Sequence, residues 1–379
     1  MWIIDRYMLR QFLSTFVICC ISLFGLYVVF DLFTNLEEFL RCGREQGGVL
    51  PLIASFYGYQ SAVFFDQTAG LLALVSAMFT ITWIQRHNEL TALMAAGVAR
   101  TRVAAPVIVA AILVAFVAAG SREFLIPQIR EALSRRPQDL IGDVGQPMDS
   151  IHDNQTDILF RGATTFANKK RIENPDFHLP RPSPLDRYGQ NLIAREAYYE
   201  SAEGDRPAGY LLQGVTKPVG LANKESLLLD GKPVVITPRD ADWLKSDECF
   251  VVSGITFQQL AGGDNWQSHS STAQLIAGLK NPSLDYGANV RVAVHSRMVQ
   301  PFLDITLLFL GLPLVLRKEN RNVFVAIGAC AAVVSLFMTV TIICRSLGAS
   351  YLVSPALGAW LPLILFVPPA VVLGDSMRQ

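Results

Sequence analysis

The hydrophobic residues of this chain are gathered in long runs that fall into two groups of three. The runs are Phe12–Phe33, Ser61–Ile84, Val103–Gly120, Met298–Leu316, Val323–Cys344 and Leu352–Leu373. Because an α-helix rises about 1.5 Å per residue, a helix of each run can cross a hydrocarbon core about 30 Å thick. The pattern predicts a polytopic α-helical membrane protein with six transmembrane helices in a three-plus-three arrangement.

The segment between the two groups changes to a period close to two, which is typical of β-structure. Its short runs are rich in β-branched and aromatic residues and are mostly bounded by Gly, Pro, Asn or Asp. They are Ile158–Phe166, Asn191–Ser201, Tyr210–Lys217, Ser226–Leu229, Pro233–Pro238 and Cys249–Leu260. Asp230-Gly231 is a hairpin turn signal, and no helical pattern separates the runs. An antiparallel sandwich, curled sheet or jelly roll is therefore expected.

The run Asn191–Ser201 changes the phase of its alternation near Arg195–Glu196, which predicts a β-bulge there. One face then carries Leu192, Ala194, Ala197 and Tyr199. The face is expected to fill the core of the β-domain, and an apolar groove for acyl chains is the alternative.

Four further segments complete the domain organisation. Glu123–Arg136 is charged and is expected to continue the third run as a helix, Ser271–Leu279 is a short helix, and Asn289–Val299 leads helically into the fourth run. The proline-rich stretch Asn174–Gly189 is expected to be an extended surface loop. The predicted domains are an N-terminal membrane half at residues 1–122, a jelly-roll-like β-domain at 123–296 and a C-terminal membrane half at 297–379.

Composition and charge support a membrane protein and give it an orientation. The 379 residues have zero formal net charge, 17% charged residues and a mean hydropathy of +0.34, which argues against a nucleic-acid partner. The first run is too long for a signal h-region and should remain as an anchor. The loops of one side carry Arg6, Arg10, Arg86, Arg100, Arg102, Arg317, Lys318, Arg321 and Arg378. Positively charged short loops stay in the cytoplasm, so both termini are expected there and the long middle segment outside.

The sequence shows no grouping typical of an enzyme, a cofactor site or a metal centre. The histidines of the middle segment are scattered without a nucleophile–base pattern. Cys42 and Cys249 are the two cysteines outside the runs, and they fall in different domains. A disulfide between them is an alternative to the favoured interpretation of two free thiols.

The sharpest local signal is the second cytoplasmic loop, residues 86–98. Asn88 is expected to cap a short helix, Glu89 suits the positive end of the helix dipole, and Gly97 can terminate the helix. One apolar stripe at helical spacing consists of Leu90, Leu93, Met94 and Gly97. Such a helix fits the groove of an ATPase subunit. The alternative is an interfacial helix that rests on lipid headgroups and binds no protein.

Motifs at the beginning, in this loop and near the end of the chain occur in a definite order. Asp5-Arg6-Tyr7-x-x-Arg10-Gln11-Phe12 precedes the first run, and Glu89-x-x-Ala92-Leu93-x-Ala95-Ala96-Gly97 follows the second. Ser296-Arg297, Pro301, Gly311-Leu312-Pro313-Leu314 and Gly358-Ala359-Trp360-Leu361-Pro362 mark the second half. Together they resemble the LptF/LptG (YjgP/YjgQ) permease family. The resemblance covers both membrane halves, and the β-region is similar to the family in layout.

The resemblance implies a subunit of an ABC-type lipopolysaccharide exporter. Members of the family pair with a paralogous permease as a heterodimer, recruit two copies of a cytoplasmic ATPase and extract lipopolysaccharide from the inner membrane. Their periplasmic jelly rolls pass the lipid to a bridge protein of similar fold. Glu89, Leu90, Leu93, Met94 and Gly97 would then couple the ATPase to the spans. The chain has no G-x-x-x-x-G-K-[ST] motif, so ATP hydrolysis is expected on a separate subunit.

One segment departs from the family pattern. Prolines are usual near the outer start of the second span, whereas this chain has Ala62-Val63-Phe64-Phe65-Asp66-Gln67-Thr68. This end of the span is expected to bend differently, and the cargo is left open between lipopolysaccharide and a related glycolipid.

Charged residues near the outer ends of the spans are candidates for lipid contact. The arginines are Arg41, Arg44, Arg122, Arg130, Arg297 and Arg345. Guanidinium groups pair well with lipid phosphates and sugar carboxylates. The alternative is that they are interfacial arginines or salt-bridge partners of nearby acids.

Three acids, Asp31, Asp66 and Asp304, lie in or near the apolar runs. A charge within a span costs about 2.5–3.5 kcal/mol on insertion scales, so each acid is expected to have a partner or to face water. An ion-coupled secondary transporter that uses Asp66 or Asp304 is one alternative function. A membrane-anchored binding or scaffold protein is the other.

Overall fold

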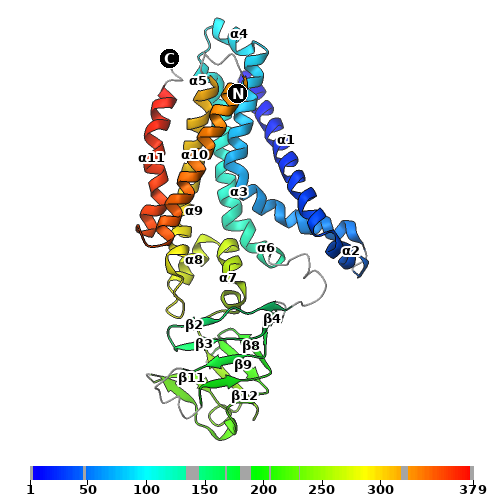
Figure 1. Ribbon diagram of the computed structural model, residues 1–379, viewed down its shortest axis with the longest axis vertical. Coiled ribbons are helices and arrows are strands. Elements are labelled where there is room, and N and C mark those ends of the chain that lie inside the picture. The colour runs from blue at the N-terminus through cyan, green and yellow to red at the C-terminus, as the bar shows by residue number, and fades with distance from the viewer. Residues whose placement is uncertain are drawn as a thin grey trace. The chain divides into compact units, whose positions relative to one another are not determined.

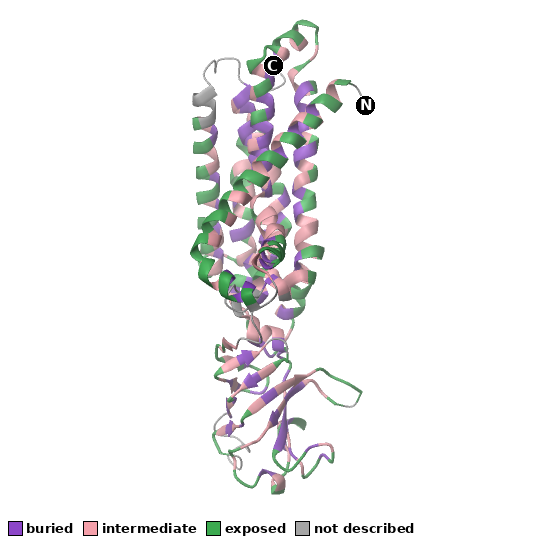
Figure 2. Cartoon of the chain, turned by 90° about the vertical axis from the view of Figure 1, so that its right-hand side faces the viewer, coloured by how far each residue is buried: buried purple, intermediate pink, exposed green. Residues whose placement is uncertain are grey.

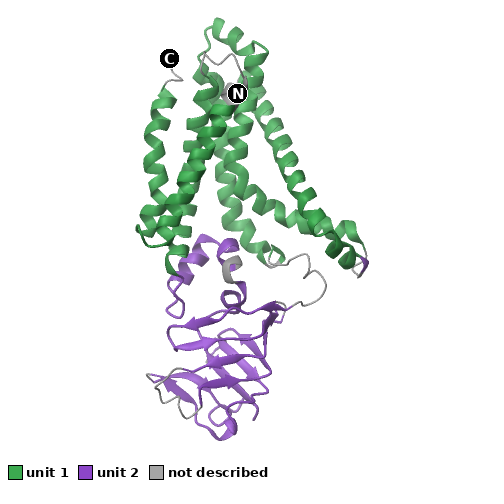
Figure 3. Cartoon of the chain, in the orientation of Figure 1, with its two compact units in different colours: residues 1–43, 48–133, 287–379 green, residues 44–47, 134–286 purple. Residues whose placement is uncertain are grey.

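The computed structural model describes residues 3–45, 48–133, 145–166, 169–179, 189–204, 206–229, 231–316 and 323–375. The chain forms two compact units (Figure 3). The helical unit comprises residues 1–43, 48–133 and 287–379, and the β unit comprises residues 44–47 and 134–286. The chain therefore enters the β unit from the first half of the helical unit and returns to the second half.

Six helices of the described residues are long and apolar enough to cross a membrane. They are α1 (Ile3–Thr34), α3 (Val49–Arg86), α5 (Arg100–Gly120), α9 (Gly287–Leu316), α10 (Val323–Ala349) and α11 (Pro355–Asp375). The prediction of six spans is confirmed. Several helices extend beyond the hydrophobic runs, as at the start of α3 and of α9.

The third span leaves the bundle through an unusual turn. α5 continues into η1, a π-helical stretch at Ser121–Leu125, and then into α6 (Ile126–Leu133). The helical continuation expected after the third span is confirmed as far as Leu133, and residues 134–136 lie outside the described part.

The middle of the helical unit is formed by α3, α5 and α9 (Figure 1). α1 packs on α3 and α5, whereas α10 and α11 pack on α9 and on each other. Close packing depends on small residues, as is usual in lipid. A Cβ atom on Gly358 of α11 would lie 2.7 Å from the Cα atom of Gly348 of α10, so the two backbones touch at this point.

The outer surface of this unit is apolar. Buried residues follow stripes along the helices, and exposed residues cover much of the rest (Figure 2). Large apolar side chains that remain exposed include Ile18, Ile21, Phe30, Val117, Ile342 and Val372. An exposed apolar surface of this extent fits contact with lipid chains.

Two helices were not predicted. In α2 (Leu36–Glu45), Phe39 and Cys42 are fully buried, and the Phe39 ring packs edge-to-face on Phe56 at 5.4 Å. In α7 (Phe257–His269), Thr256 and Gln259 form a capping box that starts the helix. The strand expected over Cys249–Leu260 therefore ends as β12 (Glu248–Val252), and its last part is helical. The short helix expected at Ser271–Leu279 is confirmed as α8 (Thr272–Leu279).

The β unit holds two antiparallel sheets in its described residues, so the predicted antiparallel β-region is confirmed. The larger sheet has the order β1-β4-β5-β8-β9-β12-β11-β10, and the smaller has the order β2-β3-β6-β7. The larger sheet contains β1 (Gln146–Pro147), β4 (Thr164–Phe166), β5 (Arg171–Glu173), β8 (Glu196–Glu200), β9 (Gly209–Gln213), β10 (Leu227–Leu229), β11 (Lys232–Ile236) and β12. The smaller contains β2 (Ile151–Asp153), β3 (Ile158–Phe160), β6 (Asp176–His178) and β7 (Asn191–Ile193).

The predicted bulge near Arg195–Glu196 is wrong. β7 belongs to the smaller sheet and β8 to the larger, so the chain changes sheets between them. This change of sheet produces the shift in alternation that the sequence shows. Leu192, Ala194 and Ala197 are at most 3% exposed and belong to the hydrophobic core, on which Tyr199 packs. The favoured interpretation, a filled core, agrees with these contacts.

Other local expectations are partly corrected. Within the stretch expected to be a loop, Asp176–His178 forms β6 and pairs with β7, while residues 180–188 lie outside the described part. β10 and β11 pair antiparallel as the hairpin signal predicts, with Gly231 at a φ of 78°, and Asp230 lies outside the described residues. Cys42 and Cys249 are free thiols, so the alternative of a disulfide between them is wrong.

Candidate functional site

The short helix α4 (Glu89–Ala95) connects α3 to α5. Gly97 ends it at a φ of 83°, which an L-residue rarely adopts. The Gly97 N–H donates to the Met94 carbonyl at 3.0 Å and the Val98 N–H donates to the Leu93 carbonyl at 3.0 Å, a Schellman motif. Asn88, in contrast, has a left-handed backbone with a φ of 57° and makes no side-chain cap, so its predicted capping role is wrong.

The two faces of α4 have different environments. Leu90 is 7% exposed and belongs to the core of the helical unit, on which Leu93 and Met94 pack. The opposite face is exposed and small, and it consists of Thr91, Ala92, Ala95, Ala96 and Gly97. Three members of the predicted apolar stripe, Leu90, Leu93 and Met94, therefore anchor α4 to its own bundle. The fourth member, Gly97, lies on the accessible face with small side chains.

Glu89 and the start of α5 are connected to the first span. The Tyr7 hydroxyl of α1 donates a hydrogen bond to Glu89 Oε2 at 3.0 Å. Next to it, Arg102 Nη2 lies 2.9 Å from Asp5 Oδ2. These two contacts join α1 to both ends of the segment that contains α4.

A second group of polar residues lies where η1 meets α3. Arg122 donates from Nε to both carboxylate oxygens of Asp66 at 2.9 Å, and its Nη2 lies 2.8 Å from Oδ1. The side chains are only 16% and 11% exposed, respectively. A multiply bonded guanidinium–carboxylate pair of this kind is geometrically specific. Asp66 therefore has the partner expected for an acid near a span, and Arg122 agrees with the alternative interpretation of a salt-bridge partner of a nearby acid.

The acid within the fourth span also has partners. Gln300 Nε2 donates to Asp304 Oδ1 at 2.8 Å, and Arg345 Nη2 of α10 donates to Gln300 Oε1 at 2.7 Å. The amide of Gln300 thus links an acid and a base on two helices. Asp31 likewise accepts from the Tyr57 hydroxyl at 2.7 Å.

The structure groups three of the six candidate arginines. Arg122 interacts electrostatically with Arg297 and with Arg345. The acids near this group are Asp66, Glu123 and Asp304. Of the other three arginines, Arg41 lies 3.6 Å from Glu38, Arg44 is at the exposed end of α2 and Arg130 is on α6. The six arginines named from the sequence therefore divide into three that lie near one another, on η1, α9 and α10, and three that lie elsewhere, on α2 and α6.

The contacts of Gln300 and Tyr7 were not predicted from the sequence, although Tyr7 stands in the opening motif. Gln300 had a usable signal, because a polar residue four positions before Asp304 in an apolar helix faces the same side. Tyr7 had none, since its contact with Glu89 joins residues 82 positions apart. Among the described residues, no group of three His, Cys, Asp or Glu side chains could hold a metal ion.

Comparison with known families identifies the group to which the protein is related. The family model for the lipopolysaccharide export system permease LptF/LptG matches residues 6–175 and 239–374, which is most of the chain. The chain belongs to the LptF/LptG family. It is the transmembrane permease of the lipopolysaccharide export ABC transporter, a multi-pass protein of the inner membrane, and the ATPase of that transporter is the separate subunit LptB. No curated protein sequence matches it.

Family membership puts the geometry of this LptF/LptG permease in context. A permease that does not hydrolyse ATP must receive mechanical work from another subunit, and α4 is a helix with one anchored and one accessible face. The group around Arg122 is a different kind of site, with charged side chains in the helical unit.

Proposed function

We propose that α4 is the element through which the ATPase subunit moves the permease. The observation that carries the proposal is its two-faced packing: the face with small side chains suits close contact with a protein groove, and Leu90, Leu93 and Met94 pass displacement to the bundle core. Glu89 adds a second path through Tyr7 to α1. Gly97 lets the helix end sharply before α5 begins.

We further propose the assembly and orientation in which this happens. Two copies of the cytoplasmic ATPase and a paralogous permease surround the chain, both termini and α4 are cytoplasmic, and the β unit is periplasmic. The positive residues flanking the spans support this orientation. A periplasmic bridge protein of related fold then receives the lipid from the β unit.

Arg122, Arg297 and Arg345 are the preferred candidates for contact with the charged part of lipopolysaccharide or a related glycolipid. Arg122 lies close enough to repel both Arg297 and Arg345, and positive groups this close together favour an anion nearby. Arg41, Arg44 and Arg130 remain secondary candidates. Extraction exposes acyl chains at a cost of about 0.8 kcal/mol per methylene, so the work delivered through α4 must be large or the chains must stay covered.

The coupling role can be tested with Glu89→Ala in the complete transporter reconstituted in vesicles. We expect ATP hydrolysis to continue while ATP-dependent lipid release slows about tenfold, the effect of losing a charge-assisted hydrogen bond of about 1.5 kcal/mol. Both rates are measured in the same vesicles. Tyr7→Phe removes only the hydroxyl that donates to Glu89, and it should also slow lipid release while ATP hydrolysis continues.

Glu37→Ala is the matched control, because it removes an exposed carboxylate from the first turn of a helix outside the proposed contact. It should release lipid at the rate of the unaltered protein. Normal release by Glu89→Ala with the complex intact would show that Glu89 plays no part in coupling.

A further inference from the structure

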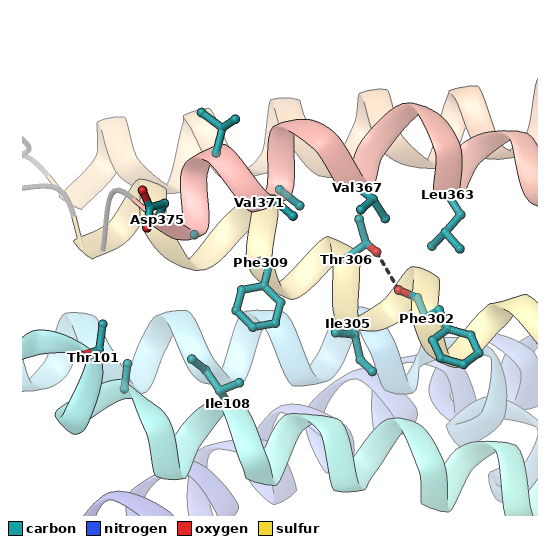
Figure 4. Close-up of a pocket in the computed structure, with 14 residues that line it drawn as sticks. Thr101, Ile108, Phe302, Ile305, Thr306, Phe309, Leu363, Val367, Val371 and Asp375 are labelled. Carbon is teal, nitrogen blue, oxygen red and sulfur yellow. Dashed lines mark hydrogen bonds between the residues drawn. The ribbon is translucent and has the colours of Figure 1, made fainter. Parts of the chain in front are cut away.

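The two sides of α9 differ in polarity. Phe302, Thr306 and Phe309 line an apolar groove of about 850 Å³ between α5, α9 and α11 (Figure 4). The Thr306 hydroxyl is used within α9, because it donates to the Phe302 carbonyl at 2.7 Å. At about 100° per residue, Gln300 and Asp304 lie on the other side of the helix, only about 40° apart. The polar chemistry of this part of α9 is therefore concentrated on the side that meets α3 and α10.

The arginines near this side, Arg122 and Arg345, are held by different chemical groups. Arg122 bonds to the carboxylate of Asp66 through contacts of 2.8–2.9 Å, which neutralise its charge. Arg345 donates instead to the neutral amide of Gln300 at 2.7 Å, and no carboxylate of the described residues forms an ion pair with it. An amide oxygen accepts a hydrogen bond without cancelling the charge of the donor. Arg345 therefore keeps more of its positive charge than Arg122 does.

One donor of Arg345 is also unused. Its Nε atom is buried and has no hydrogen-bond partner within the described part of the chain. The side chain as a whole is only partly buried, and it lies one turn before the end of α10. A buried donor without an acceptor is unfavourable. A phosphate oxygen would satisfy both the donor and the charge, because phosphate is a strong acceptor for a guanidinium group.

Asp304 is the carboxylate that would cancel this charge, since it attracts Arg345 electrostatically. Gln300 lies between the two: its Nε2 donates to Asp304 Oδ1 at 2.8 Å, and its Oε1 accepts from Arg345. Asp304 also fixes the direction of the amide, because an amide has one donor end and one acceptor end. The amide thus replaces a direct ion pair between α9 and α10.

We propose that Gln300 is a positioning residue that keeps Arg345 apart from Asp304, so that Arg345 can bind a phosphate group of the transported lipid. The inference rests on the proposed function, in which Arg345 contacts the charged part of that lipid. It makes Arg345 the phosphate-binding member of the group, whereas Arg122 is held by Asp66. Gln300 acts through Arg345 and does not itself touch the lipid.

The test measures lipid binding to the complete transporter, without nucleotide, in phosphatidylcholine vesicles. The probe is fluorescently labelled lipid A that carries its acidic sugars, with its phosphates either present or removed. Gln300→Glu together with Asp304→Asn moves the carboxylate one turn along α9, against Arg345, and conserves the net charge of the unaltered protein. Asp304→Asn alone is the comparison, because the two proteins differ only in the amide or carboxylate at residue 300.

We expect the double variant to bind the phosphorylated lipid about tenfold more weakly than Asp304→Asn does. The two proteins should bind the dephosphorylated lipid equally. A purely structural link between α9 and α10 predicts no such difference, because the hydrogen bond to Arg345 is retained in both. Equal binding of the phosphorylated lipid would overturn the proposal, as would an equal loss for the dephosphorylated lipid.

A second pair of variants tests the separation itself. Gln300→Met keeps the length of the side chain and removes the amide, so Arg345 can turn to Asp304. Binding of the phosphorylated lipid should fall about tenfold below that of the unaltered protein. Adding Asp304→Asn to Gln300→Met should restore it, because no carboxylate is left to pair with Arg345. A further loss in this double variant would contradict the proposal and assign Gln300 a structural role.

Arg345→Gln separates this inference from the proposed function. Unchanged binding of the phosphorylated lipid by Arg345→Gln would remove Arg345 from the lipid contact, and both would then fail. Weak binding by Arg345→Gln together with normal binding by both Gln300 double variants and by Gln300→Met would overturn the role of Gln300 alone.

Discussion

At the scale of single residues, Gly70 sets how closely α3 can approach the acid within α9. A Cβ atom at this position would lie 2.4 Å from Asp304 Oδ1 and 2.6 Å from its Cγ. The carboxylate has little freedom to move away, because Gln300 holds it and is itself held by Arg345. The absence of a side chain at residue 70 therefore makes room for the polar link between α9 and α10.

Gly70→Ala should consequently destabilise the permease. Forcing one methyl group into a filled site costs about 1–3 kcal/mol, and here it also displaces a bonded carboxylate. The measurement is the thermal unfolding midpoint in detergent. Gly25→Ala is the control, since a Cβ atom at Gly25 of α1 meets no atom within 4 Å. Equal midpoints for the two variants would mean that α3 can shift away from Asp304 freely.

At this scale the sequence identified the acids within the spans, but it did not predict the hydrogen bonds that join Asp304, Gln300 and Arg345. The cost of a charge in a span predicts that Asp304 has a partner. It does not say that the partner is an amide, nor that Arg345 of another helix completes the link, because contacts across the bundle depend on how the helices rotate. Leu90 is a similar case. Its helical spacing predicted an apolar stripe on α4, but the sequence did not show that this stripe packs against the chain's own bundle.

At the scale of secondary-structure elements, a polar cluster joins β5 to β8 in the β unit. Arg171 Nη1 donates to Glu196 Oε1, and the Tyr198 hydroxyl donates to Oε2 at 2.6 Å. The hydrogen bond from Tyr198 is the largest influence on the pKa of Glu196 and lowers it. Partial burial opposes this change, and the hydrogen bond and charge of Arg171 reinforce it. The net result is a pKa below the ordinary value of 4.5.

The lowered pKa gives this strand pair a pH dependence. A carboxylate whose pKa is lower in the folded state stabilises the fold above its ordinary pKa, and this contribution is lost as the pH falls through the folded-state value. We expect the protection of the β5 and β8 amides, measured relative to their intrinsic exchange rate at each pH, to fall below pH 4.5, by an amount corresponding to at most about 1 kcal/mol for a partly exposed pair.

Glu196→Gln is the control for this titration. It removes the ionisable group, so its protection at β5 and β8 should depend less on pH over the same range. An unchanged pH profile would assign the effect to other carboxylates of the β unit.

The elements that the sequence predicted are those with a strong periodic signal. Long apolar runs and β-branched runs were recognised, whereas α2 was missed because its charged residues hide a buried stripe of Phe39 and Cys42. The start of α7 could have been found, since Thr256 and Gln259 have the spacing of a capping box. The change of sheet between β7 and β8 could not, because a bulge gives the same shift in alternation.

At the scale of the whole molecule, six spans follow from the thickness of the bilayer, and their packing does not. Length and hydropathy are sufficient to find a span. They do not reveal that α3, α5 and α9 form the middle of the unit, because residues that face lipid and residues that face other helices are equally apolar. The order of the chain through the two units was nevertheless visible in the positions of the runs.

The orientation of the molecule gives a test at this scale. Thr91→Cys places a thiol on the exposed face of α4, and Lys169→Cys places one on an exposed turn of the β unit. In intact cells with a permeabilised outer membrane, an impermeant maleimide should label Lys169→Cys and should label Thr91→Cys only after the inner membrane is opened. Labelling of Thr91→Cys in sealed cells would reverse the proposed orientation.

The π-helical turn after α5 affects how related sequences should be aligned. Such a turn is an α-helix with one additional residue, and each residue in a helix advances the direction of the side chain by about 100°. Arg122 lies within this turn, at Ser121–Leu125. A homologue that lacks the insertion would direct a different position toward the counterpart of Asp66. An ungapped alignment there would then compare non-equivalent residues and could make the ion pair look lost where it has moved by one place.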